Sequence, residues 1–144
     1  MRLLVLKTHV WLAAVATVLL VKALPLRWVL RLLSPPRWLR PYRGVSAETM
    51  VEVVRRRLAR PRHMRRRACL REGLLLFHFL CLAAREPEVH FSVFEPPAGS
   101  ERLDAHCWVS LDGRTLSSPP SGSSVEMMRY RRFSLEAPMP CKPQ

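Results

Sequence analysis

The amino-acid sequence predicts an α+β fold, in which basic N-terminal helices precede a buried helix that packs on an antiparallel sheet. Apolar residues recur at helical spacing through the first half of the chain. Residues 68–84 are apolar almost all round, as is typical of a helix buried on every side. After residue 88, short strand-like runs alternate with turn signals such as Asp112-Gly113. Helices followed by strands favour the α+β class.

Charge divides the chain into two unlike halves. Its 144 residues suit one domain, and 49% hydrophobic residues exclude a disordered chain. Residues 1–72 hold 17 of the 24 Lys and Arg but three of the 11 Asp and Glu, a formal net charge of +14. This half should attract an anionic membrane surface, an acidic peptide or a nucleic acid. No helix-turn-helix, zinc-finger or RNA-binding strand motif accompanies the charge, so we expect no nucleic-acid partner.

The first 45 residues predict a pair of basic, apolar helices. Residues 10–21 carry no charge and lie between Lys7 and Lys22. No uncharged apolar stretch reaches 18 residues, so we expect no membrane-spanning helix. A cleaved signal peptide over residues 1–23 stays open. The sequence favours helices that are buried or lie on a membrane surface, because the helical pattern resumes after Lys22.

The elements that follow are marked by local signals. Ser46 is a good N-cap for a helix that ends before Pro61, and the buried helix follows it. Strands are expected over residues 89–94, 105–111, 114–118 and 127–135. The predicted divisions are an N-terminal segment (1–45), a catalytic-type domain (46–135) and a Pro-rich tail (136–144).

Four cysteines set the possible chemistry, and Cys69 is the best placed of them. None forms a CxxC pair, so we expect no metal, no cofactor and free thiols in a reducing, cytoplasmic compartment. Cys69 begins the buried helix directly after three arginines, where positive charge and the helix N-terminus stabilise a thiolate. Cys81 should be core, Cys107 should face away from His106 on its strand, and Cys141 lies in the tail.

His106 is the candidate base for a cysteine nucleophile. It lies on the predicted strand 105–111, and such a strand can pack beside the start of a helix. His78 is too far along the buried helix from Cys69 to serve. Spacing alone does not distinguish a catalytic pair from a core cysteine and a structural histidine.

Two motifs resemble those of the lasso-peptide leader peptidases. They are Ala68-Cys69-Leu70-Arg71, and Ala105-His106-Cys107-Trp108-Val109 followed by Asp112-Gly113, where that family typically reads CL-R and AHAWVE-DG. The resemblance covers about residues 50–135 and implies a transglutaminase-like, papain-related cysteine peptidase. It implies that Cys69 attacks the scissile carbonyl, and that His106 deprotonates Cys69 and later protonates the leaving amine.

The third catalytic residue departs from that family pattern. The usual Asn-Asp pair falls on Ser117 and Ser118, so Asp104 and Ser118 are the candidates to orient His106. Asp112 is expected at the hairpin tip, roughly 20 Å from His106 along the strand. The chain is therefore either a peptidase with another third residue, or a catalytically weakened or inactive scaffold of the same fold.

The resemblance also implies partners. Residues 1–45 show no strand pattern for a leader-binding winged helix, so a separate leader-binding protein would present the precursor peptide. A macrocycle-forming ligase would then act on the released core peptide. A basic membrane-surface protein, with peripheral contact through residues 1–45, is the remaining alternative.

Overall fold

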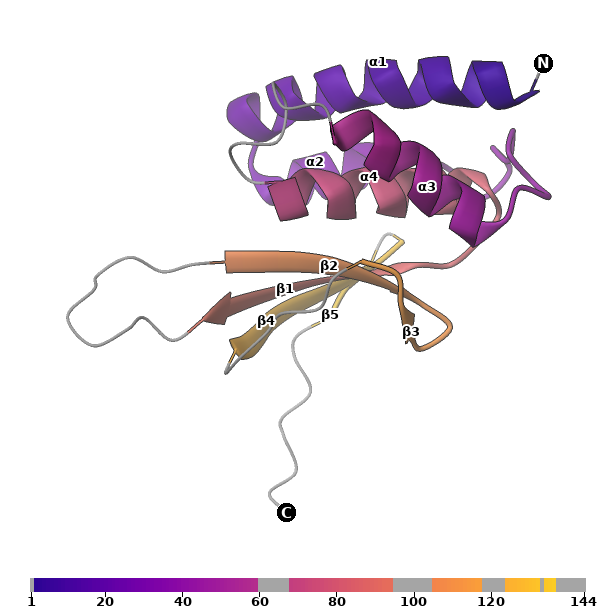
Figure 1. The fold of residues 1–144 in the computed structure, drawn as a ribbon. Helices are drawn as coiled ribbons and strands as arrows, with labels where there is room; N and C mark the ends of the chain where they lie inside the picture. The colour runs from indigo at the N-terminus through magenta and orange to yellow at the C-terminus, as the bar shows by residue number, and fades with distance from the viewer. Residues whose placement is uncertain (1, 60–67, 95–104, 118–123, 133, 137–144) are drawn as a thin grey trace.

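The protein is an α+β molecule with its helices on one side of an antiparallel sheet, as predicted (Figure 1). A computed structural model describes residues 2–59, 68–94, 105–117, 124–132 and 134–136. The helices are α1 (Arg2–Ala23), α2 (Leu26–Leu32), α3 (Ala47–Leu58) and α4 (Ala68–Leu82). The strands are β1 (Glu88–Phe94), β2 (Ala105–Leu111), β3 (Arg114–Thr115), β4 (Ser124–Arg131) and β5 (Ser134–Glu136).

The five strands lie in the order β3-β2-β1-β4-β5, and the neighbours β1 and β2 carry most of the candidate site. Val89 pairs with Val109 and Phe91 pairs with Cys107 in antiparallel register. Val89, Cys107 and Val109 are buried in the core, so this set faces the helices. The alternate positions, including His90 and His106, therefore lie on the outer face of the sheet.

Helix α4 is the centre of the core, which explains why it is apolar on every side. Nine consecutive or near-consecutive residues of α4 are buried between α1, α3 and the sheet. From β4, Tyr130 packs edge-on against Phe77 at 5.5 Å between ring centroids. The Tyr130 hydroxyl also shares a 3.0 Å hydrogen bond with Ser34, directly after α2. Residues from both halves of the chain thus close one core.

The local signals predicted α3 and the β2–β3 turn correctly. The Ser46 hydroxyl accepts a hydrogen bond from the Thr49 amide at 3.1 Å, as an N-cap should. Asp112 and Gly113 take φ angles of 50° and 77° between β2 and β3. Two positive φ values are the requirement of the tight hairpin turn that this dipeptide favours.

The structure corrects two predicted strands. The run expected over 127–135 forms two paired strands, β4 and β5, in which Tyr130 pairs with Leu135. The strand expected over 114–118 is the short strand β3, which ends at Thr115. Residues 116 and 117 contact β2 from the loop that follows. The Leu116 amide donates to the Val109 carbonyl, and the Ser117 hydroxyl accepts from the Val109 amide at 2.8 Å.

The sequence analysis expected no helix that could span a membrane, and by length and composition this expectation was wrong. Among the described residues, one helix, Leu3–Ala23, is long and apolar enough to cross a membrane, with a mean hydropathy of 2.0. Lys7 and Lys22 lie close to its two ends, so they leave the intervening run apolar. Leu6 and Val10 of the same helix are buried in the core of the domain.

Candidate active site

Cys69 lies in the first turn of α4 and is half-buried, with a free thiol. Backbone amides of a first helical turn lack intrahelical acceptors, so they can donate to an oxyanion that forms beside this thiol. The same turn is tied to α3 by an ion pair between Glu72 and Arg55, with 2.9 Å between Oε1 and Nε. Arg55 also donates to the Leu116 carbonyl at 3.1 Å. The start of α4 is therefore held between α3 and the segment that follows β3.

Cys107 faces this part of α4 from strand β2. A Cβ atom built on Gly73 would lie 2.5 Å from the Cys107 Sγ, so the sulfur rests directly on the glycine. Gly73 is one helical turn after Cys69 and on the same helix face. Burial, and after it the nearby Cys69 and Glu72, raises the pKa of Cys107. The two thiols therefore share one face of α4, and Cys107 is an inert, protonated member of the core.

His106 takes the opposite side of β2. Its ring stacks along the strand on Trp108, at 6.2 Å between centroids and 22° between planes, and it meets Phe94 of β1 at 6.2 Å. Cys107 and His106 thus face opposite ways, as strand alternation requires. A Cys69–His106 pair needs the imidazole on the face beside the start of α4, whereas the structure has Cys107 on that face and the His106 ring on the outer one.

Neither predicted candidate for a third catalytic residue is among the residues that the structure describes. Asp104 and Ser118 both lie outside the described residues. Ser117 is buried and its hydroxyl is engaged by the Val109 amide, so it extends the edge of β2. Asp112 is exposed at the hairpin tip, where its positive φ supports its role as a turn residue.

Ser92 is a residue beside His106 that the sequence did not single out. It is the register partner of His106 on β1 and is only 1% exposed. Its hydroxyl has no hydrogen-bond partner among the described residues. A buried hydroxyl needs a partner, and its position next to the candidate base makes Ser92 relevant to how that imidazole is held. Only the strand register, which is not local in sequence, reveals it.

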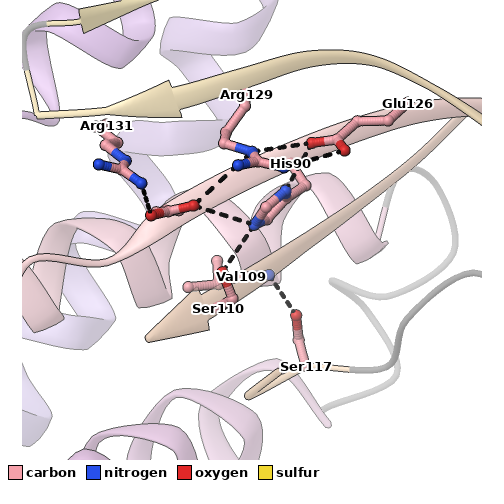
Figure 2. Close-up of polar contacts among 8 residues, drawn as sticks. His90, Val109, Ser110, Ser117, Glu126, Arg129 and Arg131 are labelled. Carbon is pink, nitrogen blue, oxygen red and sulfur yellow. Dashed lines mark hydrogen bonds and ion pairs between the residues drawn. The ribbon is translucent and has the colours of Figure 1, made fainter. Parts of the chain in front are cut away.

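Further along the outer face, His90 forms a polar network that links three strands (Figure 2). Its Nδ1 donates to Glu126 Oε1 at 2.7 Å, and its Nε2 shares a 2.7 Å hydrogen bond with Ser110 Oγ. The ring also stacks on Trp108 at 5.0 Å. Burial raises the pKa of Glu126, but hydrogen bonds from His90 and Arg129 outweigh that effect and hold the pKa below its ordinary value. This network joins β1, β2 and β4 and is separate from Cys69.

Cys81 and His78 lie where the sequence predicted them. Cys81 is fully buried, and burial raises its pKa to about 11. His78 turns away from Cys69, toward α1 and α2, where its Nδ1 contacts the Leu33 carbonyl at 2.9 Å. Cys141 lies outside the described residues. In the part of the chain that the structure describes, no group of three His, Cys, Asp or Glu side chains is arranged to hold a metal ion.

A family model of the transglutaminase-like superfamily matches residues 10–130. The chain belongs to this superfamily. The match begins inside α1 and ends in β4, so it includes the helical half as well as the sheet. No curated protein and no solved structure shows significant similarity to the chain.

Membership gives the geometry its chemical context. The transglutaminase-like superfamily includes cysteine peptidases and transglutaminases. Both act by attack of a cysteine thiolate on an acyl carbon, with a neighbouring base to accept and return the proton. Among the three cysteines that the structure describes, Cys69 is half-buried at a helix N-terminus, while Cys81 and Cys107 are buried.

Proposed function

We propose that this transglutaminase-like protein is a cysteine peptidase that removes the leader from a ribosomally made, lasso-type precursor peptide. The observation that carries the proposal is the position of Cys69. It is half-buried in the first turn of α4, which packs on the strand that bears His106, in a chain of this superfamily. The motifs around both residues, which resemble those of the leader peptidases, support the choice of substrate.

Each proposed step uses a group of this chain. The Cys69 thiolate attacks the scissile carbonyl carbon, and the resulting oxyanion is stabilised by backbone amides at the start of α4. His106, protonated by the thiol, gives its proton to the leaving amine as the peptide C–N bond breaks. Water then attacks the thioester with His106 as base, which releases the leader carboxylate and regenerates the thiol.

The His106 ring has to reach Cys69 for this cycle. In the structure it stacks on Trp108 instead. Because that ring lies on the face of β2 opposite Cys107, which meets α4, the pair needs a change in the position of His106 and not only a shorter hydrogen bond. We propose that the bound precursor peptide, presented by a separate leader-binding protein in the cytoplasm, completes the pair. Asp104 and Ser118 stay our candidates for the residue that orients it, and a macrocycle-forming ligase would take the released core peptide.

A non-catalytic scaffold of the same fold is the second candidate. Two observations favour it: Cys107, rather than a histidine, covers the α4 face that carries Cys69, and Ser118 stands where the leader-peptidase resemblance calls for aspartate. Such a protein would keep the peptide-binding surface without the reaction.

Thiol reactivity against pH separates the two. We would alkylate the protein and the His106→Ala variant over a pH series, each with the precursor peptide and the leader-binding protein present because these complete the pair, and resolve each cysteine by mass spectrometry. The peptidase predicts that Cys69 reacts well below the pH expected of a free thiol, and that His106→Ala abolishes this. Cys81 and Cys107 are internal controls, since burial raises both pKa values. Equal, ordinary reactivity of Cys69 in both proteins favours the scaffold.

Cleavage of the precursor is the direct assay. With the leader-binding protein added, the peptidase predicts cleavage that is abolished by Cys69→Ala and reduced about 10²-fold or more by His106→Ala. Cys107→Ala is the matched control, because it removes the neighbouring thiol and leaves the nucleophile. Cleavage that survives Cys69→Ala rules out the assigned nucleophile.

A further inference from the structure

Helix α1 has two unlike environments around one apolar sequence. Its inner side, with Leu6, Val10 and Thr17 at most 1% exposed, belongs to the core. Its outer side lies on the far side of the helical layer from the sheet (Figure 1). That side is apolar too and is exposed at Leu4, Val5, Trp11, Leu12, Val15 and Leu19, with exposed fractions from 40% to 69%. We call these six residues the α1 outer face.

The α1 outer face is too apolar for contact with water alone. A surface helix normally carries polar side chains opposite its buried stripe. A contiguous exposed apolar patch made of several large side chains marks a site that binds a partner or a membrane. Helix α1 runs for 22 residues, about 33 Å, and the six residues recur at helical spacing along most of that length.

Basic side chains border this face at the end near α3. Lys7, Trp11, Arg56 and Arg57 line a groove of about 320 Å³ between α1 and α3, together with Glu52, which forms an ion pair with Arg56. The Arg57 guanidinium lies 5.8 Å from the centroid of the Trp11 ring. Tryptophan beside cationic side chains is the composition of helices that lie at a membrane interface, where the ring and the aliphatic stems are buried and the charges meet lipid phosphates.

Charge favours an anionic bilayer over a second copy of the chain. The chain carries a formal net charge of +13, so two copies that meet at basic surfaces repel each other. An anionic lipid surface has the opposite sign and attracts each nearby Lys or Arg. The apolar face and its basic border therefore match the two layers of a bilayer interface, acyl chains and headgroups.

The inner contacts of α1 favour a helix that lies in the plane of the membrane. The His9 Nδ1 and the Tyr42 hydroxyl share a 2.8 Å hydrogen bond, and the His9 ring packs edge-on against Phe79 of α4 at 5.0 Å. A membrane-crossing α1 would leave the domain and expose Leu6, Val10 and their partners on α4 to water. A helix in the interface keeps these contacts and buries only its outer face.

We propose that the α1 outer face docks the protein on the surface of an anionic lipid bilayer, with α1 parallel to the membrane and the sheet directed away from it. The peptidase site would then work at a membrane surface. The docking does not depend on the peptidase reading, because neither Cys69 nor His106 takes part in it.

Vesicle co-sedimentation of the full chain tests the docking. Vesicles would contain phosphatidylcholine with or without phosphatidylglycerol, at low and high salt. We expect binding that requires phosphatidylglycerol and weakens with salt, because screening reduces the electrostatic part. The double variant Leu12→Gln/Leu19→Gln should bind at least about tenfold more weakly, since two exposed apolar side chains no longer enter the acyl region.

The matched control is Val125→Gln/Met127→Gln on β4. These side chains are 55% and 57% exposed, much like Leu12 at 54% and Leu19 at 63%. The control should bind vesicles like the wild type, and both double variants should keep the wild-type circular dichroism spectrum and unfolding midpoint. A wild-type protein that does not bind, or equal loss in both variants, overturns the proposal.

Two further outcomes would name another arrangement. If the bound protein resists alkaline carbonate extraction, α1 crosses the bilayer and the in-plane model is wrong. If Leu12→Gln/Leu19→Gln binds vesicles normally but loses association with the leader-binding protein or with itself, the α1 outer face is a protein interface and the lipid proposal falls. Cleavage activity is not a readout in these arms, so the peptidase proposal stands or fails separately.

Discussion

Gly73 has no room for a side chain, since a Cβ there would lie 2.5 Å from the buried Cys107 Sγ. We expect Gly73→Ala to lower the free energy of unfolding by about 1–3 kcal/mol, the usual cost of overpacking a core. Cys107→Ala removes the opposing sulfur and should suppress this loss in the double variant. Alanine is also favoured over glycine within a helix by about 1 kcal/mol.

Urea unfolding of the two single variants and the double variant measures this coupling. The control is Cys107→Ala alone, which reports the cost of losing the thiol. If Gly73→Ala lowers the free energy of unfolding equally with Cys107 and with Cys107→Ala, the sulfur is not the atom that excludes the methyl group.

Ala84, two residues after the last residue of α4, has the left-handed backbone conformation that favours glycine. Its φ is 64°, and the Arg85 amide bonds to the Leu80 carbonyl at 3.0 Å, as in a Schellman-type helix end. A left-handed conformation costs a residue with a Cβ about 1–2 kcal/mol. Ala84→Gly should therefore raise the free energy of unfolding by about 1 kcal/mol.

The control for this prediction is the preceding residue. Ala83 still donates its amide to the Phe79 carbonyl at 2.9 Å, so it belongs to the helical turn. Ala83→Gly should lower the free energy of unfolding by about 0.5–1 kcal/mol. If both glycine variants shift the urea midpoint in the same direction, the left-handed strain at Ala84 is not the cause.

At the scale of elements, two histidines lie between α1 and α4. The rings of His9 and His78 meet at right angles, 6.0 Å apart. Burial lowers both pKa values from the ordinary histidine value of 6.5. For His78 the hydrogen bond with the Leu33 carbonyl opposes this effect without cancelling it, and the charge of His9 adds to the lowering. The docking of α1 on α4 therefore prefers neutral imidazoles.

This contact predicts loss of stability in acid. Below a pH of 6.5, the unfolded chain binds protons that the folded chain resists, so the unfolding free energy falls until the pH passes below the folded pKa values. His78→Asn keeps a hydrogen-bond donor near the Leu33 carbonyl but cannot titrate. Between about pH 7 and pH 5, the variant should lose less stability than the wild type in urea unfolding.

The double comparison removes other acid effects, because carboxylates titrate alike in both proteins. An unchanged pH slope in His78→Asn would mean that protonation of His78 does not oppose folding. If the pH slope is smaller and hydrogen exchange of the α1 amides shows that α1 keeps its contacts, the pH dependence arises where α1 packs on α4.

At the scale of the whole molecule, the N-terminal helices and the sheet close one core. The buried residues of α1, α2 and α3 belong to the same cluster as those of α4 and the strands. The superfamily match also starts within α1, at residue 10. The division between an N-terminal segment and a catalytic-type domain at residue 45 stays a prediction. The helices before residue 45 and the elements after it share one core.

Deletion of residues 1–23 should prevent stable folding. It removes Leu6 and Val10, and a buried aliphatic side chain contributes about 2–5 kcal/mol when it is lost from a core. A domain has only about 5–15 kcal/mol of net stability. We expect the truncated chain to lack a cooperative urea transition and near-ultraviolet circular dichroism.

The outer-face variant Leu12→Gln/Leu19→Gln is the control for the deletion, because it changes α1 without touching its inner side. It should unfold like the wild type. A truncated chain that folds with wild-type cooperativity would show that α1 is an appendage of the domain.

Much of the fold was predictable because its signals are local. The Ser46 cap fixes the start of α3, and the Asp112-Gly113 dipeptide fixes the turn after β2. The continuous apolar run of α4 predicted a helix buried on all sides. Strand alternation also required Cys107 and His106 to face opposite ways.

The candidate site was predictable only in part. Local sequence placed Cys69 at a helix N-terminus and His106 on a strand, and both positions are confirmed. The face of β2 that meets α4 depends on how the helix packs on the sheet. This packing decides that Cys107 rests on Gly73, while His106 stacks on Trp108. The His90–Glu126 contact needs the pairing of β1 with β4, distant in sequence.

The sequence by itself determined the elements, the charge division and the two motifs, because helix caps, turn dipeptides and apolar periodicity act over a few residues. The tertiary structure decided which sides of these elements are used. Helix α1 is apolar on both sides, so no periodic pattern distinguishes its core side from its outer face. That choice, like the face of β2, is made by packing between residues far apart in the chain, and this packing sets where the thiol, the imidazole and the α1 outer face lie.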